Sequence, residues 1–141
     1  MRTHILTAAL VGLSLAGVVV SSLALREHYS NEPSPCRIDA VWDCGIVNQS
    51  PFAVIRGVPV AMIGILGYAL LAALAGRFPR VVALAAVLST AFALRLTWIE
   101  WRVLQVWCIY CVTSQAIIFA VLVLSLVQAF VPTKVRITTQ T

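Results

Sequence analysis

Charged residues are scarce in this chain, and they lie in short clusters. Only 11% of its 141 residues are Asp, Glu, Lys or Arg. Hydrophobic residues make up 61%, compared with roughly 45–50% apolar residues in an ordinary soluble domain. The polar residues are too few to cover the surface of a water-soluble fold. We therefore expect a single domain, residues 1–141, that lies in a lipid bilayer.

Signals for several classes of protein are missing. The net charge of +5 does not indicate a nucleic-acid-binding protein, because the basic residues form no stripe beside an aromatic surface. The sequence has no Gly-rich nucleotide loop, which argues against nicotinamide and ATP. Val112 stands where a covalent haem motif needs His. Zinc is disfavoured by the Cys-x7-Cys spacing and by the lack of a nearby His, so we predict no metal.

Four long apolar runs are present. Each is long enough to span about 30 Å of hydrocarbon at 1.5 Å per residue. They cover approximately residues 5–25, 58–75, 81–99 and 109–131. A Gly/Pro turn at 76–80 predicts that the second and third are antiparallel neighbours. The predicted fold is an all-α integral membrane protein, a four-transmembrane-helix bundle.

A long first connection, 26–57, separates the first two runs. It contains Pro33, Pro35 and Pro51 and shows no sustained helical periodicity, so we expect a loop with one short helix after Asn48. The first run itself has some features of a signal peptide. Its apolar stretch is longer than usual and lacks a clean cleavage site, so we interpret it as a retained helix.

The positions of Lys and Arg predict the orientation. Short segments on one side of the membrane hold a dense basic set, Arg2, Arg77, Arg80, Lys134 and Arg136. Such density predicts the cytoplasmic side, with both termini inside and the loop 26–57 outside. Three tryptophans, Trp98, Trp101 and Trp107, then lie near the outer interface, as expected for an aromatic belt. Arg95, the one charge within a predicted span, is close enough to the outer end to reach the headgroups.

All four cysteines fall outside or at the outer membrane surface in this topology. An even count in an oxidising compartment points to disulfides. Cys36 and Cys44 lie in the Pro-rich loop, where a disulfide can either tether the loop or exchange with a partner. Cys108 and Cys111 open the fourth helix.

The Cys108-x-x-Cys111 spacing favours exchange over a structural role. Side chains at i and i+3 share a helix face, so the bond can open with little backbone movement. The helix N-terminus favours the thiolate of Cys108. A structural disulfide gains most by closing a long loop, and this ring is short. Since Cys111 lies one turn into the lipid zone and no bound redox group is indicated, elimination suggests a membrane quinone as the electron acceptor.

This pattern resembles the vitamin K epoxide reductase family in its compact bacterial form. The resemblance covers nearly the whole chain and rests on the order of the cysteine pairs, the loop pair first and the helix pair last. In the unrelated quinone-coupled oxidases of the Dsb type, the Cys-x-x-Cys comes first. The other matching features are Ser50, Gly57-Val58-Pro59 at the opening of the second helix, Gly64, Tyr68 and Val112.

The resemblance implies a function and a set of site residues. It implies a bacterial inner-membrane thiol oxidoreductase that reoxidises a thioredoxin-fold (Dsb-type) disulfide donor and reduces ubiquinone or menaquinone. Because the chain ends at Thr141, we expect this partner to be a separate protein. The loop pair would be the shuttle, with Cys36 attacked by the partner and Cys44 exchanging with Cys108. The quinone-binding residues would be Cys111, Ser50, Tyr68 and Val112.

Three alternatives remain at this stage. Ser50, which precedes Pro51, equally suits a turn or a helix cap. The same cysteines also fit vitamin K epoxide reduction as in animals. From a different class, a non-enzymatic membrane protein would keep all its disulfides static, and the redox state of the cysteines in cells distinguishes it from a relay.

Overall fold

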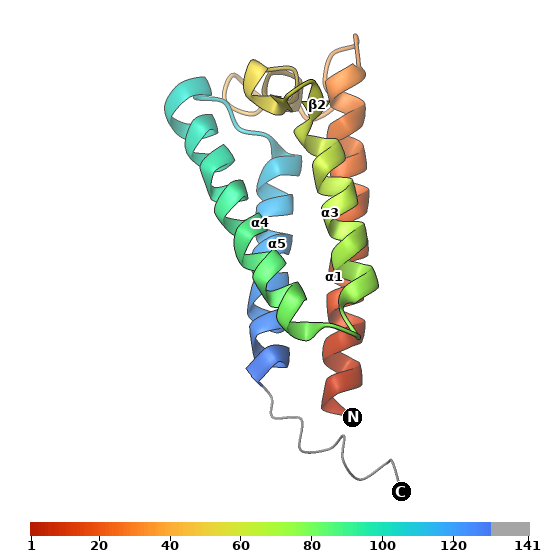
Figure 1. Cartoon of the computed structure of the whole chain (residues 1–141). Helices are drawn as coiled ribbons and strands as arrows, with labels where there is room; N and C mark the ends of the chain where they lie inside the picture. The colour runs from red at the N-terminus through yellow and green to blue at the C-terminus, as the bar shows by residue number, and fades with distance from the viewer. Residues whose placement is uncertain (131–141) are drawn as a thin grey trace, which may run out of the picture.

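Four helices run along the length of the molecule and are joined at one end by a folded loop (Figure 1). This computed structural model describes residues 1–130. The long helices are α1 (Arg2–Tyr29), α3 (Val60–Leu74), α4 (Pro79–Ile99) and α5 (Ile109–Phe130). The end of the predicted fourth helix at Val131 lies outside the described residues, as do Lys134 and Arg136, on which the predicted orientation partly depends.

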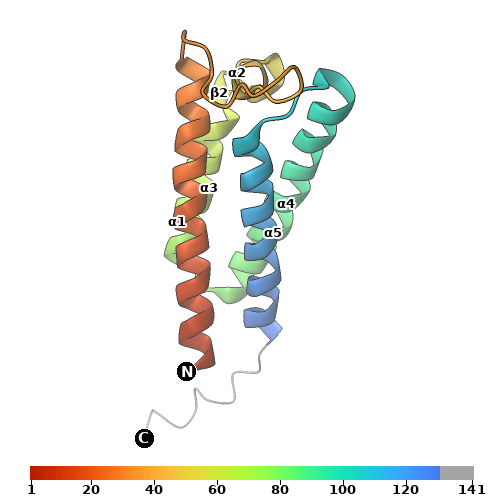
Figure 2. The same cartoon turned by 180° about the vertical axis from the view of Figure 1, so that it is seen from behind.

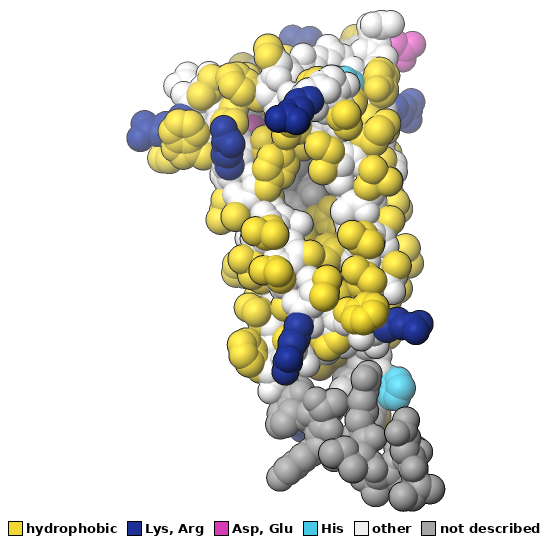
Figure 3. All heavy atoms as spheres, in the orientation of Figure 1, with side chains coloured by type: hydrophobic (Ala, Val, Ile, Leu, Met, Phe, Trp, Pro, Cys, Tyr) yellow, Lys and Arg dark blue, Asp and Glu magenta, His cyan; other side chains and the backbone are white. Residues whose placement is uncertain are grey.

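Three of these helices are long and apolar enough to cross a membrane: α1, α4 with its extension to Leu104, and α5. Helix α3 is also apolar but has only 15 residues, roughly 22 Å at 1.5 Å per residue. Many large apolar side chains point outward, and Leu84, Leu88 and Phe119 are each more than half exposed. Figure 3 shows hydrophobic side chains along the whole face, with Lys and Arg toward its two ends. This distribution is that of a membrane protein.

The helices pack as two pairs, α1 with α3 and α4 with α5, and the pairs meet along α1 and α5. Helix α1 lies along α3 and α5, and α4 lies along α5. The core between them includes Leu10, Leu71, Val82 and Val121. Gly17 allows α1 to approach α3 closely, because a Cβ at this position would lie 2.4 Å from the Tyr68 ring. The absence of a side chain on Gly17 therefore fixes the position of Tyr68.

The first connection contains more structure than predicted. The short helix predicted after Asn48 is present as a 3-10 helix, η1 (Pro51–Ala53), rather than an α-helix, and a second short helix, α2 (Cys44–Asn48), precedes it. Asp43 begins α2 as an N-cap, accepting a hydrogen bond from the Ile46 N–H at 3.2 Å.

A small hairpin replaces the predicted start of the second long helix. Strands β1 (Val54–Ile55) and β2 (Val58–Pro59) pair in an antiparallel manner. The turn between them places Arg56 at φ 50° and Gly57 at φ 83°, the backbone of a two-residue hairpin that favours Gly. Helix α3 consequently begins at Val60 rather than at residue 58.

The outer end of α4 is also irregular. A π-helical turn, η2 (Glu100–Leu104), extends α4, and Gln105 ends it in a left-handed conformation at φ 54°. The chain then returns toward the bundle and enters α5. This turn directs the side chain of Glu100 inward, where it is only 4% exposed.

Candidate functional site

The outer loop is tied by its backbone to the segment that precedes α5. The N–H of Asp43 donates to the carbonyl of Trp107 at 3.0 Å, and the N–H of Trp107 donates to the carbonyl of Val41 at 2.7 Å. The rings of Trp42 and Trp107 lie beside each other, with centroids 6.3 Å apart. Seen from behind, the loop with α2 crosses the end of the bundle between α1 and α5 (Figure 2). The loop cysteines are therefore held over the start of α5.

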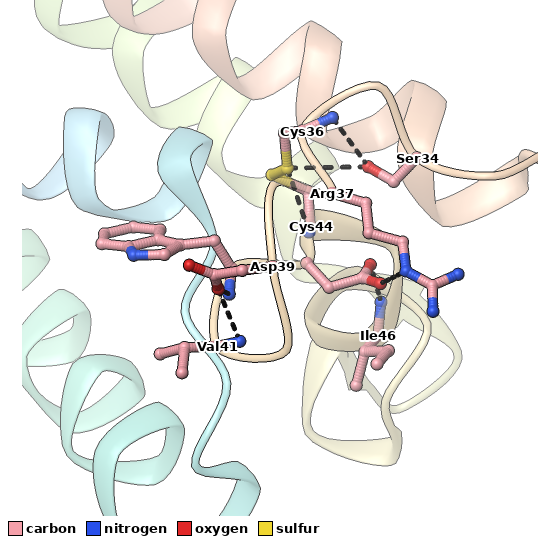
Figure 4. Close-up of polar contacts among 9 residues, drawn as sticks. Ser34, Cys36, Arg37, Asp39, Val41, Cys44 and Ile46 are labelled. Atoms are coloured by element: carbon pink, nitrogen blue, oxygen red, sulfur yellow. Dashed lines mark hydrogen bonds and ion pairs between the residues drawn. A yellow bond between two sulfur atoms is a disulfide. The ribbon is translucent and has the colours of Figure 1, made fainter.

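Cys36 and Cys44 form a disulfide in this loop, with Cα atoms 5.8 Å apart. The Cys44 N–H donates to the Cys36 sulfur at 3.0 Å, and the Ser34 hydroxyl lies 3.5 Å from the same sulfur (Figure 4). Arg37 pairs with Asp43 at 3.5 Å. Both cysteines are buried, Cys36 at 7% exposure and Cys44 at 0%. The disulfide is therefore shielded from solvent in this conformation of the loop.

Cys108 and Cys111 are free thiols at the start of α5. The Cys108 sulfur accepts hydrogen bonds from the Asn48 side-chain amide at 3.3 Å and from the Cys111 N–H at 3.4 Å. Hydrogen bonding with the Cys111 side chain lowers the pKa of the Cys108 thiol, and these two donors act in the same direction. Burial and the nearby Glu100 charge oppose this shift of the pKa. The net effect favours the thiolate that disulfide exchange requires.

Asn48 connects the two cysteine pairs. Its side-chain NH₂ group donates to the Cys44 carbonyl at 2.8 Å as well as to the Cys108 sulfur. The carbonyl of Asn48 contacts His28 at the end of α1. Cys36, Cys44 and Cys108 form one buried cluster, against which Cys111 packs. The loop pair and the helix pair thus belong to a single site.

Replacing Asn48 with leucine is expected to raise the pKa of the Cys108 thiol. The substitution removes one donor to the sulfur, and a hydrogen bond to a charged group contributes about 1.5–3 kcal/mol. One pKa unit corresponds to about 1.4 kcal/mol, so the thiolate fraction at neutral pH should fall by about tenfold. The measurement is the rate of Cys108 alkylation by a small reagent as a function of pH.

The matched control is Gln49→Leu, which removes the side-chain amide of the next residue, at the end of α2. Gln49 donates to the carbonyls of Glu27 and Ser30 at 3.1 and 2.7 Å and does not bond to a sulfur. In Gln49→Leu, the pH midpoint of Cys108 alkylation should equal that of the parent protein. Equal midpoints for all three proteins would mean that Asn48 does not tune Cys108.

A cavity of about 220 Å³ lies below the loop, between the long helices. Three of the four predicted quinone-binding residues line it: Cys111, Ser50 and Tyr68. The fourth, Val112, does not, and its side chain is 38% exposed, because the next residue on a helix points about 100° away. On the face seen in Figure 3, the surface is hollowed between α3 and α4 just below the loop.

Polar groups meet at only a few points of this largely apolar cavity. The Tyr68 hydroxyl bonds to the carbonyl and the hydroxyl of Ser114 at 2.8 and 2.9 Å, which joins α3 to α5. The Ser50 hydroxyl donates to the Val47 carbonyl at 2.8 Å, so it closes a turn of the loop and does not cap a helix. The remaining polar lining groups are Asn48, Ser21, Ser89, Thr97, Glu100, Tyr110 and Gln115.

The sequence analysis missed two residues of the site. Asn48 was considered only as a helix boundary, although it bonds to both cysteine pairs. Glu100 has no role in the sequence analysis, yet its carboxylate accepts a hydrogen bond from the Cys108 N–H at 3.3 Å. A signal for Glu100 was available, since it is the one acid between the third apolar run and Cys108.

The fold and the site together define a class of protein. A helical membrane protein brings two cysteine pairs to one end of the bundle and sets one cysteine against an apolar cavity. This arrangement is that of a membrane thiol oxidoreductase.

Residues 8–126 match the model of the vitamin K epoxide reductase family. The chain belongs to this family, as its cysteine pattern predicted. Membership implies, in general, a membrane oxidoreductase of thiols and quinones. A search of curated proteins finds no match to the chain.

Proposed function

We propose that this protein oxidises the thiols of an extracytoplasmic thioredoxin-fold protein and transfers the electrons to a membrane quinone. One observation carries the proposal. Two cysteine pairs far apart in the sequence form one buried cluster, and Cys111 of that cluster lines a cavity between membrane helices. A static framework would need neither the shared cluster nor the cavity.

The relay consists of two disulfide exchanges and one oxidation. A partner dithiol reduces the Cys36–Cys44 disulfide and is itself oxidised. The Cys44 thiolate then attacks Cys108 of an oxidised Cys108–Cys111 pair, and Cys111 leaves as a thiolate that takes up the proton lost by the Cys36 thiol. Cys36 attacks Cys44, which restores the loop disulfide and frees Cys108. The reduced helix pair finally loses two electrons to the quinone, and its disulfide forms again.

The cavity has properties that suit a quinone head group. Its volume of about 220 Å³ is below the roughly 300–1,000 Å³ of pockets for drug-sized ligands, so a ring fits while an isoprenoid tail remains outside. The hollow between α3 and α4 provides a lateral path from the lipid. The Ser114 hydroxyl, held beside Tyr68, can donate a hydrogen bond to a quinone carbonyl, and the quinone would supply two-electron acceptance.

The proposal also includes a topology and a location. The protein has four spans in a bacterial inner membrane, and the short α3 completes the set because it packs along α1. The cysteines face outward and both termini are cytoplasmic, as the density of Arg2, Arg77 and Arg80 indicates. The partner is a separate Dsb-type protein, and the quinone is ubiquinone or menaquinone.

Quinone reduction by the purified protein with a reduced thioredoxin-fold donor tests this function. The expected result is a decrease of quinone absorbance with equimolar oxidation of donor dithiol. The control is the protein with Cys36 and Cys44 both replaced by serine, which should not accept electrons from the protein donor. Oxidation of the donor with no quinol formed would exclude the quinone. Reduction of vitamin K epoxide instead would favour the activity known in animals.

A further inference from the structure

Glu100 is a buried acid that the relay above does not use. Its side chain is 4% exposed and lines the cavity beside Cys111. Among residues 1–130, the only ion pair joins Arg37 and Asp43, so no cation compensates Glu100 there. Arg102, on the same turn, stacks on Trp101 with its guanidinium 4.8 Å from the ring centroid. A buried carboxyl without a counterion is costly to maintain in a fold.

Glu100 is bonded to the helix pair and shares the cavity with it. One carboxyl oxygen accepts the Cys108 N–H at 3.3 Å, which leaves the other oxygen available. Glu100 and Cys111 both line the cavity, so the carboxyl group and the sulfur face the same space. The other titratable groups facing this region are Cys108, Tyr68 and Tyr110.

We infer that Glu100 is a catalytic residue that takes the proton of the Cys111 thiol during oxidation and passes it to an oxygen of the reduced quinone. The inference rests on the proposed function. The Cys111 S–H bond breaks, a carboxyl O–H bond forms on Glu100, and that bond breaks again as a quinol O–H bond forms. Cys108 enters as the thiolate, so the second quinol proton comes from water at the outer surface. The two sulfurs lose two electrons, which the quinone gains.

The geometry gives this role to Glu100 rather than to a tyrosine. The Tyr68 hydroxyl is already bonded to Ser114, and it lies on α3, across the cavity from the helix pair. No histidine lines the cavity. Glu100 is bonded to the helix pair, lines the cavity together with Cys111 and carries a readily exchangeable proton. A proton carrier positioned in this way typically accelerates a reaction by 10²–10⁴-fold.

The test compares Glu100→Gln with Glu100→Asp and with Glu27→Gln, a control at a second glutamate that is also 4% exposed but does not line the cavity. With a small dithiol as donor, Glu100→Gln should lower kcat about 100-fold, whereas KM for quinone should stay within about threefold. The variant should also lose the limb of the pH profile that reports the carboxyl group. Glu100→Asp should recover part of kcat, and Glu27→Gln should match the parent protein.

A second readout needs no quinone. Infrared difference spectra between the dithiol and disulfide states of Cys108 and Cys111 should contain a carboxylic acid carbonyl band that Glu100→Gln removes. A parental kcat and pH profile in Glu100→Gln, or a band that survives the substitution, would overturn the inference. Equal loss of activity in Glu100→Gln and Glu100→Asp, with weakened quinone binding, would assign Glu100 a structural role instead. If the parent protein itself reduces no quinone, the proposed function fails, and the infrared band still decides whether Glu100 exchanges a proton with Cys111.

Discussion

Quinone reduction should fall by at least about 10³-fold in Cys111→Ser with every thiol donor, because the sulfur that faces the cavity is a reacting atom and the loss of a nucleophile acts on this scale. Cys111 is the one cysteine of the four that lines the cavity. A hydroxyl at this position cannot form the disulfide that delivers the electrons. The measurement is the initial rate of quinol formation with a small dithiol and, separately, with a reduced thioredoxin-fold protein.

Cys36→Ser is the matched comparison, since it removes a cysteine of the same cluster that does not line the cavity. It should abolish turnover with the protein donor but retain most of the rate with a small dithiol, which can reach the helix pair directly. Equal loss of the small-dithiol rate in Cys36→Ser and Cys111→Ser would contradict this division of roles.

The second large effect is the accumulation of an intermediate in Cys36→Ser. When the Cys44 thiolate has attacked Cys108, only Cys36 can resolve the resulting bond. Without it, a disulfide between Cys44 and Cys108 should become the dominant species once quinone has oxidised the helix pair and no external thiol is present to reduce the bond. Asn48 bonds to the carbonyl of Cys44 and to the sulfur of Cys108, so these residues already lie close together. Mass spectrometry of an alkylated digest detects the cross-linked peptide.

Cys44→Ser is the control for this experiment, because it retains Cys36 but removes the attacking sulfur. No cross-link to Cys108 should form in this variant. If Cys36 were instead the inner cysteine, the pattern would reverse, and a Cys36 to Cys108 bond would accumulate in Cys44→Ser. That outcome would invert the order of the relay.

Much of the fold follows from hydropathy alone. Both ends of α4 and the start of α5 lie close to their predicted positions, because a run of apolar residues indicates burial in lipid or in the bundle. The predicted start of the second helix at residue 58 is wrong, because the apolar run that begins there includes strand β2 of the hairpin. A short apolar segment does not by itself distinguish a strand from a helix.

The parts of the site that escaped prediction depend on contacts distant in sequence. The burial of Glu100 depends on a π-helical turn and on the left-handed Gln105, and neither has a local sequence signal. Asn48 lies 60 residues from Cys108, and only the backbone pairing of Asp43 with Trp107 brings them together. The two cysteine pairs were predictable because their spacing carries chemical meaning without knowledge of the fold. The residues that tune them were not, because an Asn or a Glu acquires such a role only from its neighbours.

The length of α1 bears on where the cysteine sulfurs lie relative to the lipid. With 28 residues it extends roughly 42 Å at 1.5 Å per residue, which exceeds the hydrocarbon thickness of about 30 Å. Helix α2 attaches to the far end of α1, where Asn48 contacts His28 and Gln49 bonds to the carbonyls of Glu27 and Ser30. In the proposed topology, this excess length places the sulfurs of the relay at the aqueous boundary and the cavity below them at the depth of the acyl chains.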